Sequence, residues 1–250
     1  MQEEFRLNNG KFHIAGTKYI PDVNPKNIPI ILCHGFLSNQ KDLARYKDGF
    51  LELGYTVYTF DFCGSSKKGK SEGSYDYMTV EHELKDIQTV IDSVTESKNQ
   101  LMLFGVSQGA FMALLYAARN PAVVARVLTV SPALCIPDDA RRGKMLMMTF
   151  DPNDIRGTYK CKKGMDFSPI FAEEAILLDT DKIIKEVLCP VCIVHGAKDE
   201  IVNATYLRKT LENLSHESFV YFLKKANHSF KKKEQDMAME YFKDFLKEQR

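Results

Sequence analysis

Short, uninterrupted apolar runs recur along this chain, and they constrain its fold more than any other feature of the sequence. A strand buried on both faces of a parallel sheet gives such a run, whereas a strand with one face in water alternates apolar and polar residues. The runs lie at residues 29–33, 55–60, 101–104, 127–130, 191–194 and 219–222. Segments with helical periodicity lie between or after them, at residues 41–53, 80–94, 108–118, 204–214 and 235–247. The alternation predicts an α/β fold with a mostly parallel central sheet and helices on both of its faces.

Two segments depart from this alternation. Residues 5–20 have strand-like patterning around Asn9-Gly10, a dipeptide typical of hairpin turns. Residues 133–187 contain no clear strand, and they are too many for a single crossover helix. They include apolar pieces, such as residues 144–148, that need a surface to bury against. We therefore predict a single domain over residues 1–250, with a small helical cap inserted at residues 133–187.

The composition excludes several classes of protein. Lys and Arg total 34 and Asp and Glu total 33, so the formal net charge is +1 and the basic excess of a typical nucleic-acid binder is absent. No run of about 18 apolar residues occurs, which argues against membrane insertion, and the N-terminus shows no secretory signal. We therefore expect a cytoplasmic protein. The sequence leaves the formation of a homodimer open.

Two of the six cysteines, Cys189 and Cys192, have the C-x-x-C spacing of redox motifs. A redox motif normally opens a helix, because the helix dipole lowers the pKa of the thiol. Here the pair opens a predicted strand instead. We therefore predict buried free thiols, with neither redox nor metal chemistry.

The segment Gly105-Val-Ser107-Gln-Gly109 lies between a predicted strand and a predicted helix. A nucleophilic serine has to project from a tight strand-to-helix turn, and glycines two residues away on each side leave room for that turn. The helix that follows directs backbone N–H groups toward developing negative charge. A glycine-rich turn with a serine that takes no part in catalysis would have the same five-residue sequence. The predicted strand before it and helix after it are therefore what favours a nucleophilic serine. We predict that Ser107 is the nucleophile.

A nucleophilic serine needs a base, and the base needs a carboxylate to orient it. Of the six histidines, His228 follows the last predicted strand in a late loop that opens toward the carboxyl edge of the sheet. Asp199 follows the preceding strand, and the adjacent Glu200 is its rival for the acid role. The chain order Ser107, Asp199, His228 is the order used by one large class of serine hydrolases. We predict these three residues as the catalytic set.

The tetrahedral intermediate of such a reaction carries an oxyanion that backbone N–H groups stabilise. His34-Gly35-Phe36 ends an early predicted strand, and Gln108 follows the predicted nucleophile. We predict that the N–H groups of Phe36 and Gln108 bind the oxyanion. A strand-end turn without this role remains the alternative for His34-Gly35. This chemistry requires no metal and no organic cofactor, and we predict neither.

Together these features resemble the α/β-hydrolase superfamily. Within it, the chain is similar to small bacterial esterases of the feruloyl or cinnamoyl type and to serine-aminopeptidase-like (S33) and monoacylglycerol-lipase-like hydrolases. The motifs that carry the resemblance are His34-Gly-Phe36, Gly105-x-Ser-Gln-Gly109, Ser131-Pro-Ala133, Phe150-Asp-Pro152 and His195-Gly-x-x-Asp199. The match spans most of the chain. It implies an α/β-hydrolase fold, hydrolysis of carboxylic esters through an acyl-enzyme, and a cap that selects the acyl group.

One segment departs from the family pattern. Where relatives often carry a short Gly-His-Gly loop, this chain has a longer basic stretch at residues 61–73 that includes Lys67, Lys68 and Lys70. We expect this loop near the entrance of the site. A solvated basic loop is the simpler interpretation of its charge, and a preference for acidic substrates is the alternative.

The cap supplies candidates for substrate binding. We place His34, Met147, Phe150 and Tyr159 in the pocket, and Met145, Met148 and Phe167 are further apolar candidates. Packing of the cap onto the core explains each apolar cap residue equally well. We expect a small-molecule ester with a small, aryl or medium-chain acyl group. A non-catalytic binding module, an acyltransferase, a thioesterase and a peptidase on the same residues remain the alternatives.

Overall fold

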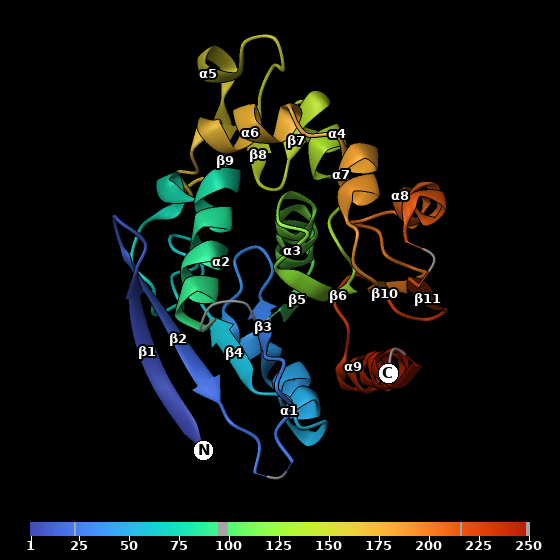
Figure 1. Cartoon of the computed structure of the whole chain (residues 1–250). Coiled ribbons are helices and arrows are strands. Elements are labelled where there is room, and N and C mark those ends of the chain that lie inside the picture. Colours follow the sequence, from blue (N-terminus) through green and yellow to red (C-terminus); the bar gives the residue numbers. More distant parts are fainter. Residues whose placement is uncertain (23, 95–99, 216, 249–250) are drawn as a thin grey trace.

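A single twisted sheet forms the centre of the molecule (Figure 1). The computed structural model describes residues 1–22, 24–94, 100–215 and 217–248. In this part of the chain the sheet has eight strands, in the order β1-β2-β4-β3-β5-β6-β10-β11. Their bounds are β1 Gln2–Asn8, β2 His13–Tyr19, β3 Ile30–Cys33, β4 Val57–Phe60, β5 Leu101–Val106, β6 Val124–Val130, β10 Val191–Gly196 and β11 Phe219–Leu223.

The six strands from β4 to β11 pair in parallel, and the β1–β2 hairpin adds to β4 in antiparallel register. The prediction of a mostly parallel sheet is therefore confirmed. Parallel strands place all their carboxyl ends at one edge. The loops that follow β3, β5, β6, β10 and β11 therefore emerge side by side at that edge.

Helices cover both faces of the sheet (Figure 1). One face packs against α1 (Ala44–Glu52) and α9 (Lys232–Glu248), where the rings of Phe50, Phe104 and Phe242 contact one another. The other face packs against α2 (Val80–Val94) and α3 (Gln108–Arg119). The short helices η1 Gln40–Leu43, η2 Tyr75–Tyr77, α8 Thr205–Thr210 and η3 Leu211–Asn213 lie in the connections. Among the described residues, no helix is both long and apolar enough to cross a membrane.

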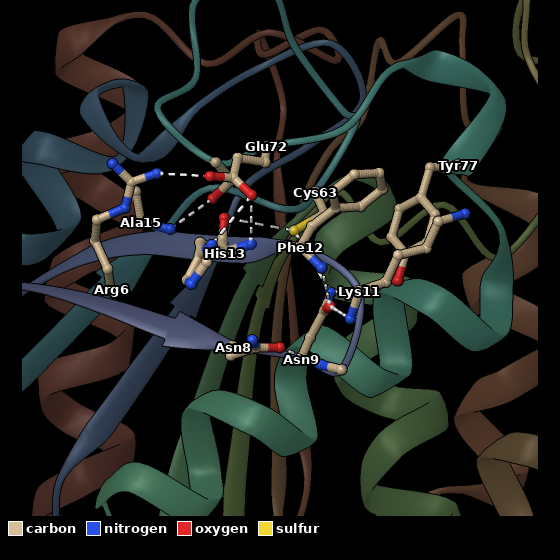
Figure 2. Close-up of polar contacts among 12 residues, drawn as sticks. Arg6, Asn8, Asn9, Lys11, Phe12, His13, Ala15, Cys63, Glu72 and Tyr77 are labelled. Atoms are coloured by element: carbon tan, nitrogen blue, oxygen red, sulfur yellow. Dashed lines mark hydrogen bonds and ion pairs between the residues drawn. The ribbon is translucent and has the colours of Figure 1, made fainter.

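Buried polar contacts join the N-terminal hairpin to α2. The side-chain amide of Asn9 donates to Asp86 Oδ1 at 2.7 Å, and the backbone N–H of Cys63 donates to Asp86 Oδ2 at 2.7 Å. Burial raises the pKa of Asp86 to about 6, although these hydrogen bonds lower it. Figure 2 shows the surface side of this region, where Arg6 and His13 of the hairpin converge on the carboxylate of Glu72.

Residues 133–187 form a separate layer beside the carboxyl edge of the sheet, above α2 and α3 in Figure 1. The segment was predicted as a small helical cap, and besides its helices it contains three two-residue strands that form a small antiparallel sheet. Strands this short carry no periodicity that a sequence pattern could show. The elements are α4 Ile136–Arg141, β7 Lys144–Met145, β8 Met148–Thr149, α5 Ile155–Thr158, β9 Lys160–Cys161, α6 Pro169–Ile176 and α7 Thr180–Glu186.

The turn from β5 to α3 is strained at one residue. Ser107 has φ 54° and ψ −118°, a region that non-glycine residues rarely adopt. The glycines on either side permit the turn: a Cβ on Gly105 would lie 2.5 Å from the backbone nitrogen of Ala110. A Cβ on Gly109 would lie 2.2 Å from the carbonyl oxygen of His34. Glycine is therefore needed at both positions, because a side chain would collide with the backbone of α3 or with the backbone just after β3.

We expect Gly109→Ala to lower the free energy of unfolding by about 1–3 kcal/mol, because the new methyl group collides with backbone that cannot move aside. Urea denaturation measures this loss. Gly49→Ala in α1 is the matched control, since the atoms nearest its new Cβ belong to the flexible side chain of Met239 and alanine favours a helix. An equal, small effect of both substitutions would contradict the close-packing argument.

Candidate active site

Ser107 and His228 lie in contact at the carboxyl edge of the sheet. Ser107 Oγ is 2.9 Å from His228 Nε2, although the two residues are 121 positions apart in the chain. Ser107 follows β5, and His228 lies in the loop between β11 and α9. Because His228 Nδ1 is hydrogen-bonded to a carboxylate, the Ser107 hydroxyl donates to the free lone pair of Nε2.

That carboxylate belongs to Asp199. His228 Nδ1 donates to Asp199 Oδ2 at 2.8 Å, while Oδ1 accepts the backbone N–H groups of Ile201 and Val202 at 3.0 and 2.8 Å. Burial by itself would raise the pKa of Asp199, but the hydrogen bonds from His228 and Val202 hold it below its ordinary value. Asp199 therefore stays ionised and orients the His228 ring. Its neighbour Glu200 is exposed and has no part in this contact.

The loops after β10 and β11 approach closely enough to bring Asp199 and His228 together. The backbone N–H of Lys198 donates to the carbonyl of Ala226 at 2.9 Å. A Cβ on Gly196 would lie 2.5 Å from the carbonyl oxygen of Asn227, so glycine is needed where the loops meet. The 29 residues from the acid to the base thus contain α8, η3 and the strand β11, which pairs in parallel with β10.

His195 supports this arrangement, and the sequence argument assigned it no role beyond its place in a motif. Its ring is fully buried, and Nε2 donates to the carbonyl of Val202 at 2.9 Å while lying 3.6 Å from Asp199 Oδ2. Burial lowers the pKa of His195, so the ring stays neutral. It therefore helps to hold the Asp199 loop without competing for the charge of the carboxylate. The available signal was a histidine at the end of a core strand, followed by glycine.

The loop after β3 passes directly beside the serine. A Cβ on Gly35 would lie 3.3 Å from Ser107 Cβ, and the next residue but one, Leu37, turns the loop with φ 56°. Within the described residues, the backbone N–H groups of Phe36 and Gln108 have no protein acceptor. For Gln108 this is expected, because it is the first residue of α3 and the first N–H groups of a helix lack intrahelical partners. Both groups are free to stabilise negative charge beside Ser107.

His34 does not line the pocket, so this prediction needs correction. The residue is buried, its Nδ1 donates to the carbonyl of Gly35 at 2.9 Å, and its Nε2 accepts the N–H of Phe62 at 3.0 Å. Both ring nitrogens are therefore used within the protein. Burial lowers the pKa of His34, which keeps the ring neutral. His34 fixes the loop that carries Phe36 rather than contacting a substrate.

A pocket of about 640 Å³ opens over Ser107 and His228. The hairpin turn between β7 and β8 reaches into it with Leu146 and Met147, and Leu146 has a positive φ of 53°. The remaining lining is Gly35, Phe36, Ser38, Asp42, Leu43, Tyr46, Val106, Val130, Ile201, Ser229, Phe230 and Gln235. Its lining residues include no lysine or arginine, and the carboxylate of Asp42 accepts from Ser38 at 2.7 Å. The pocket therefore suits a neutral, apolar group.

Of the predicted cap residues, Met147 lies in this pocket, but Phe150 and Tyr159 do not. Phe150 is buried and stacks on Tyr159 with the ring centres 6.1 Å apart, and the Tyr159 hydroxyl donates to the carbonyl of Ser168 at 3.1 Å. Their placement in the pocket is corrected: they pack the cap against itself. Met145, Met148 and Phe167 are likewise buried outside the pocket lining. Sequence reasoning missed Leu146, Ile201 and Phe230, whose apolar character alone did not distinguish them.

The basic loop borders a different cavity. None of its residues lines the pocket over Ser107, and Lys68 and Lys70 instead border a second cavity of about 210 Å³ with Gln40 and Asp61. Lys70 Nζ lies 3.0 Å from Glu4, so part of the basic charge is neutralised within the protein. The loop thus contributes no residue to the lining of the pocket over Ser107, and its position near the entrance stays a prediction.

The family model described as "Serine aminopeptidase, S33" matches residues 24–174, more than half of the chain. Among curated proteins, the mitochondrial palmitoyl-protein thioesterase ABHD10 of Bos taurus is 26% identical over 237 residues, which cover 88% of this chain and 73% of that protein. Monoacylglycerol lipase abhd6-B of Xenopus laevis is 29% identical over 124 residues, which cover 49% of this chain and 36% of that protein.

Two solved structures show the same fold. Est1E from Butyrivibrio proteoclasticus, with ferulic acid bound, superposes with a TM-score of 0.88 at 23% identity and covers 98% of both chains. The alpha/beta hydrolase domain-containing protein 10 from mouse has a TM-score of 0.76 at 20% identity and covers 99% of this chain and 100% of that one. The predicted superfamily is thereby confirmed. This chain belongs to the serine aminopeptidase S33 family and is a hydrolase with the α/β-hydrolase fold.

Proposed function

We propose that this protein is a serine esterase that cleaves carboxylic esters of small, aryl or medium-chain acyl groups through an acyl-enzyme. One observation carries the proposal: a continuous chain of hydrogen bonds joins Ser107 Oγ, His228 and Asp199 at the base of an apolar pocket. This is the arrangement that nucleophilic catalysis by serine requires.

In the proposed mechanism, Ser107 Oγ attacks the ester carbonyl while His228 Nε2 takes its proton. Asp199 stays ionised and stabilises the imidazolium that forms. The N–H groups of Phe36 and Gln108 bind the oxyanion of the tetrahedral intermediate. His228 then protonates the departing alcohol, and a water molecule repeats the sequence to release the acid and restore Ser107.

Thioesters are a second candidate class of substrate. Cleavage of a thioester uses the same attack and differs in the leaving thiol, which departs more easily than an alcohol. The relative matched over 88% of this chain is described as a palmitoyl-protein thioesterase, which supports testing this class. The pocket, with apolar walls and no lysine or arginine in its lining, accommodates an acyl chain from either class.

Ser107→Ala should lower kcat/KM for p-nitrophenyl acetate by at least about 10⁴-fold, because it removes the nucleophile. The variant should also lose labelling by a fluorophosphonate probe. Ser93→Ala, at a remote position in α2, is the control and should keep both properties. Activity or labelling that persists without Ser107 would refute the proposed function.

Met147→Ala should lower kcat/KM for p-nitrophenyl hexanoate about 10- to 100-fold relative to the acetate ester, because a longer acyl chain loses apolar contact with the hairpin turn. Initial rates with both esters measure this ratio. Met237→Ala, in the exposed surface of α9, removes the same side chain away from the pocket. An unchanged preference in the Met147 variant would show that the turn does not select the acyl group.

A further inference from the structure

A carboxyl group lies buried behind the candidate active site, and the proposed mechanism gives it no role. Glu83 is in the first turn of α2, with only 2% of its surface exposed. Its Oε2 accepts a hydrogen bond from the side-chain amide of Gln108 at 2.6 Å. Gln108 is the residue directly after Ser107, and its backbone N–H is one of the two proposed oxyanion donors.

The contact with Glu83 is the only side-chain hydrogen bond of Gln108 within the described residues. Gln108 is itself 1% exposed, and its Oε1 is buried without a partner. The anchor thus acts at the first residue of α3, immediately beyond the strained φ of Ser107 and one residue before the close approach at Gly109. Fixing the Gln108 side chain limits how far the adjacent peptide groups can rotate.

The geometry points to Glu83 as a positioning residue that holds Gln108, and with it the oxyanion-binding N–H, through a buried side-chain hydrogen bond. This inference rests on the proposed serine-hydrolase function and assigns Glu83 no contact with substrate. It adds a second helix, α2, to the elements that determine the geometry at Ser107. It also gives a physical reason for a buried acid that forms no ion pair with a cation in the described part of the chain.

The charges that surround Glu83 favour its protonated form. Burial raises the pKa of Glu83 to about 8, although the Gln108 hydrogen bond lowers it. The negative charges of Asp86 on α2 and Glu174 on α6 raise the pKa of Glu83 further. On β3, the pKa of the Cys33 thiol is raised by burial and by the nearby Glu83. From α3, Arg119 pairs with the exposed Glu81. Below about pH 8, Glu83 is therefore an uncharged hydrogen-bond partner.

Ionisation of Glu83 would oppose the reaction. As pH rises through 8, the proton leaves and a negative charge appears next to the residue whose N–H stabilises the oxyanion. In a buried site this charge is poorly screened, so it destabilises a transition state of the same sign. The expected result is a kcat that falls with rising pH above about 8.

The test uses Glu83→Gln and Glu83→Leu in the full chain, with kcat and KM for p-nitrophenyl acetate measured from pH 6 to 10. Glu83→Gln keeps an acceptor for Gln108 without a titrating group. Its kcat at pH 7 should stay within about threefold of the native value, and its decline near pH 8 should disappear or move up by at least one pH unit. Glu83→Leu removes the anchor, so kcat should fall about 10- to 100-fold with little change in KM.

Asp86→Asn is the matched control. It removes a buried carboxylate from the same helix face, one that bonds Asn9 and Cys63 rather than Gln108. It should retain the decline, moved slightly toward lower pH because one acidic neighbour of Glu83 is gone. Binding of a trifluoromethyl ketone, which forms an oxyanion on Ser107, should weaken in Glu83→Leu in parallel with kcat.

A native kcat in folded Glu83→Leu, or an unchanged decline above pH 8 in Glu83→Gln, would overturn the inference. A Glu83→Gln variant that folds but is as slow as Glu83→Leu would also overturn it. If thermal unfolding shows that Glu83→Leu does not fold, the pH profile of Glu83→Gln decides alone. Loss of activity in Ser107→Ala together with native behaviour of the Glu83 variants would reject only the role of Glu83, because the hydrolase function would stand.

Discussion

The strained backbone at Ser107 is the constraint on which the rest of the site depends. A non-glycine residue in such a conformation costs about 1–3 kcal/mol and persists only when its surroundings enforce it. Here the N–H of Ser107 donates to the carbonyl of Val130 on β6, and its carbonyl accepts the N–H of Ala133, where the cap begins. Close backbone contacts at Gly105 and Gly109 further restrict the backbone conformation of the turn. This one turn therefore joins the sheet, helix α3 and the cap.

Of the buried titratable groups that hold the loops around that turn, two histidines are neutral and one carboxylate is charged. Burial keeps both His34 and His195 neutral. His34 fixes the loop that contains Phe36, and His195 fixes the loop that contains Asp199. Asp199 stays ionised because His228 and two backbone N–H groups satisfy it. Asp199 is thus the ionised group that contacts His228 directly, through the hydrogen bond at Nδ1.

The core of the fold was predictable because strands buried on both faces leave continuous apolar runs, and the three residues of the hydrogen-bonded chain were predictable from their places after such runs. The lining of the pocket was not. Phe150, which stacks inside the cap, and Leu146, which faces the pocket, are both apolar cap residues in segments without periodicity. The two strand-end histidines are each followed by glycine, so sequence alone could not place His34 beneath a loop rather than beside a substrate.

The two-residue turn between β7 and β8 keeps part of the pocket lining apart, along the chain, from the loops that hold Ser107, Asp199 and His228. Leu146 and Met147 form the turn of a small sheet that, within the described residues, shares no strand with the sheet whose β5 leads into Ser107. Their side chains can therefore be exchanged without shifting the register of any core strand. Substitutions at this turn can therefore change the shape of the pocket while the positions of Ser107 and His228 stay the same.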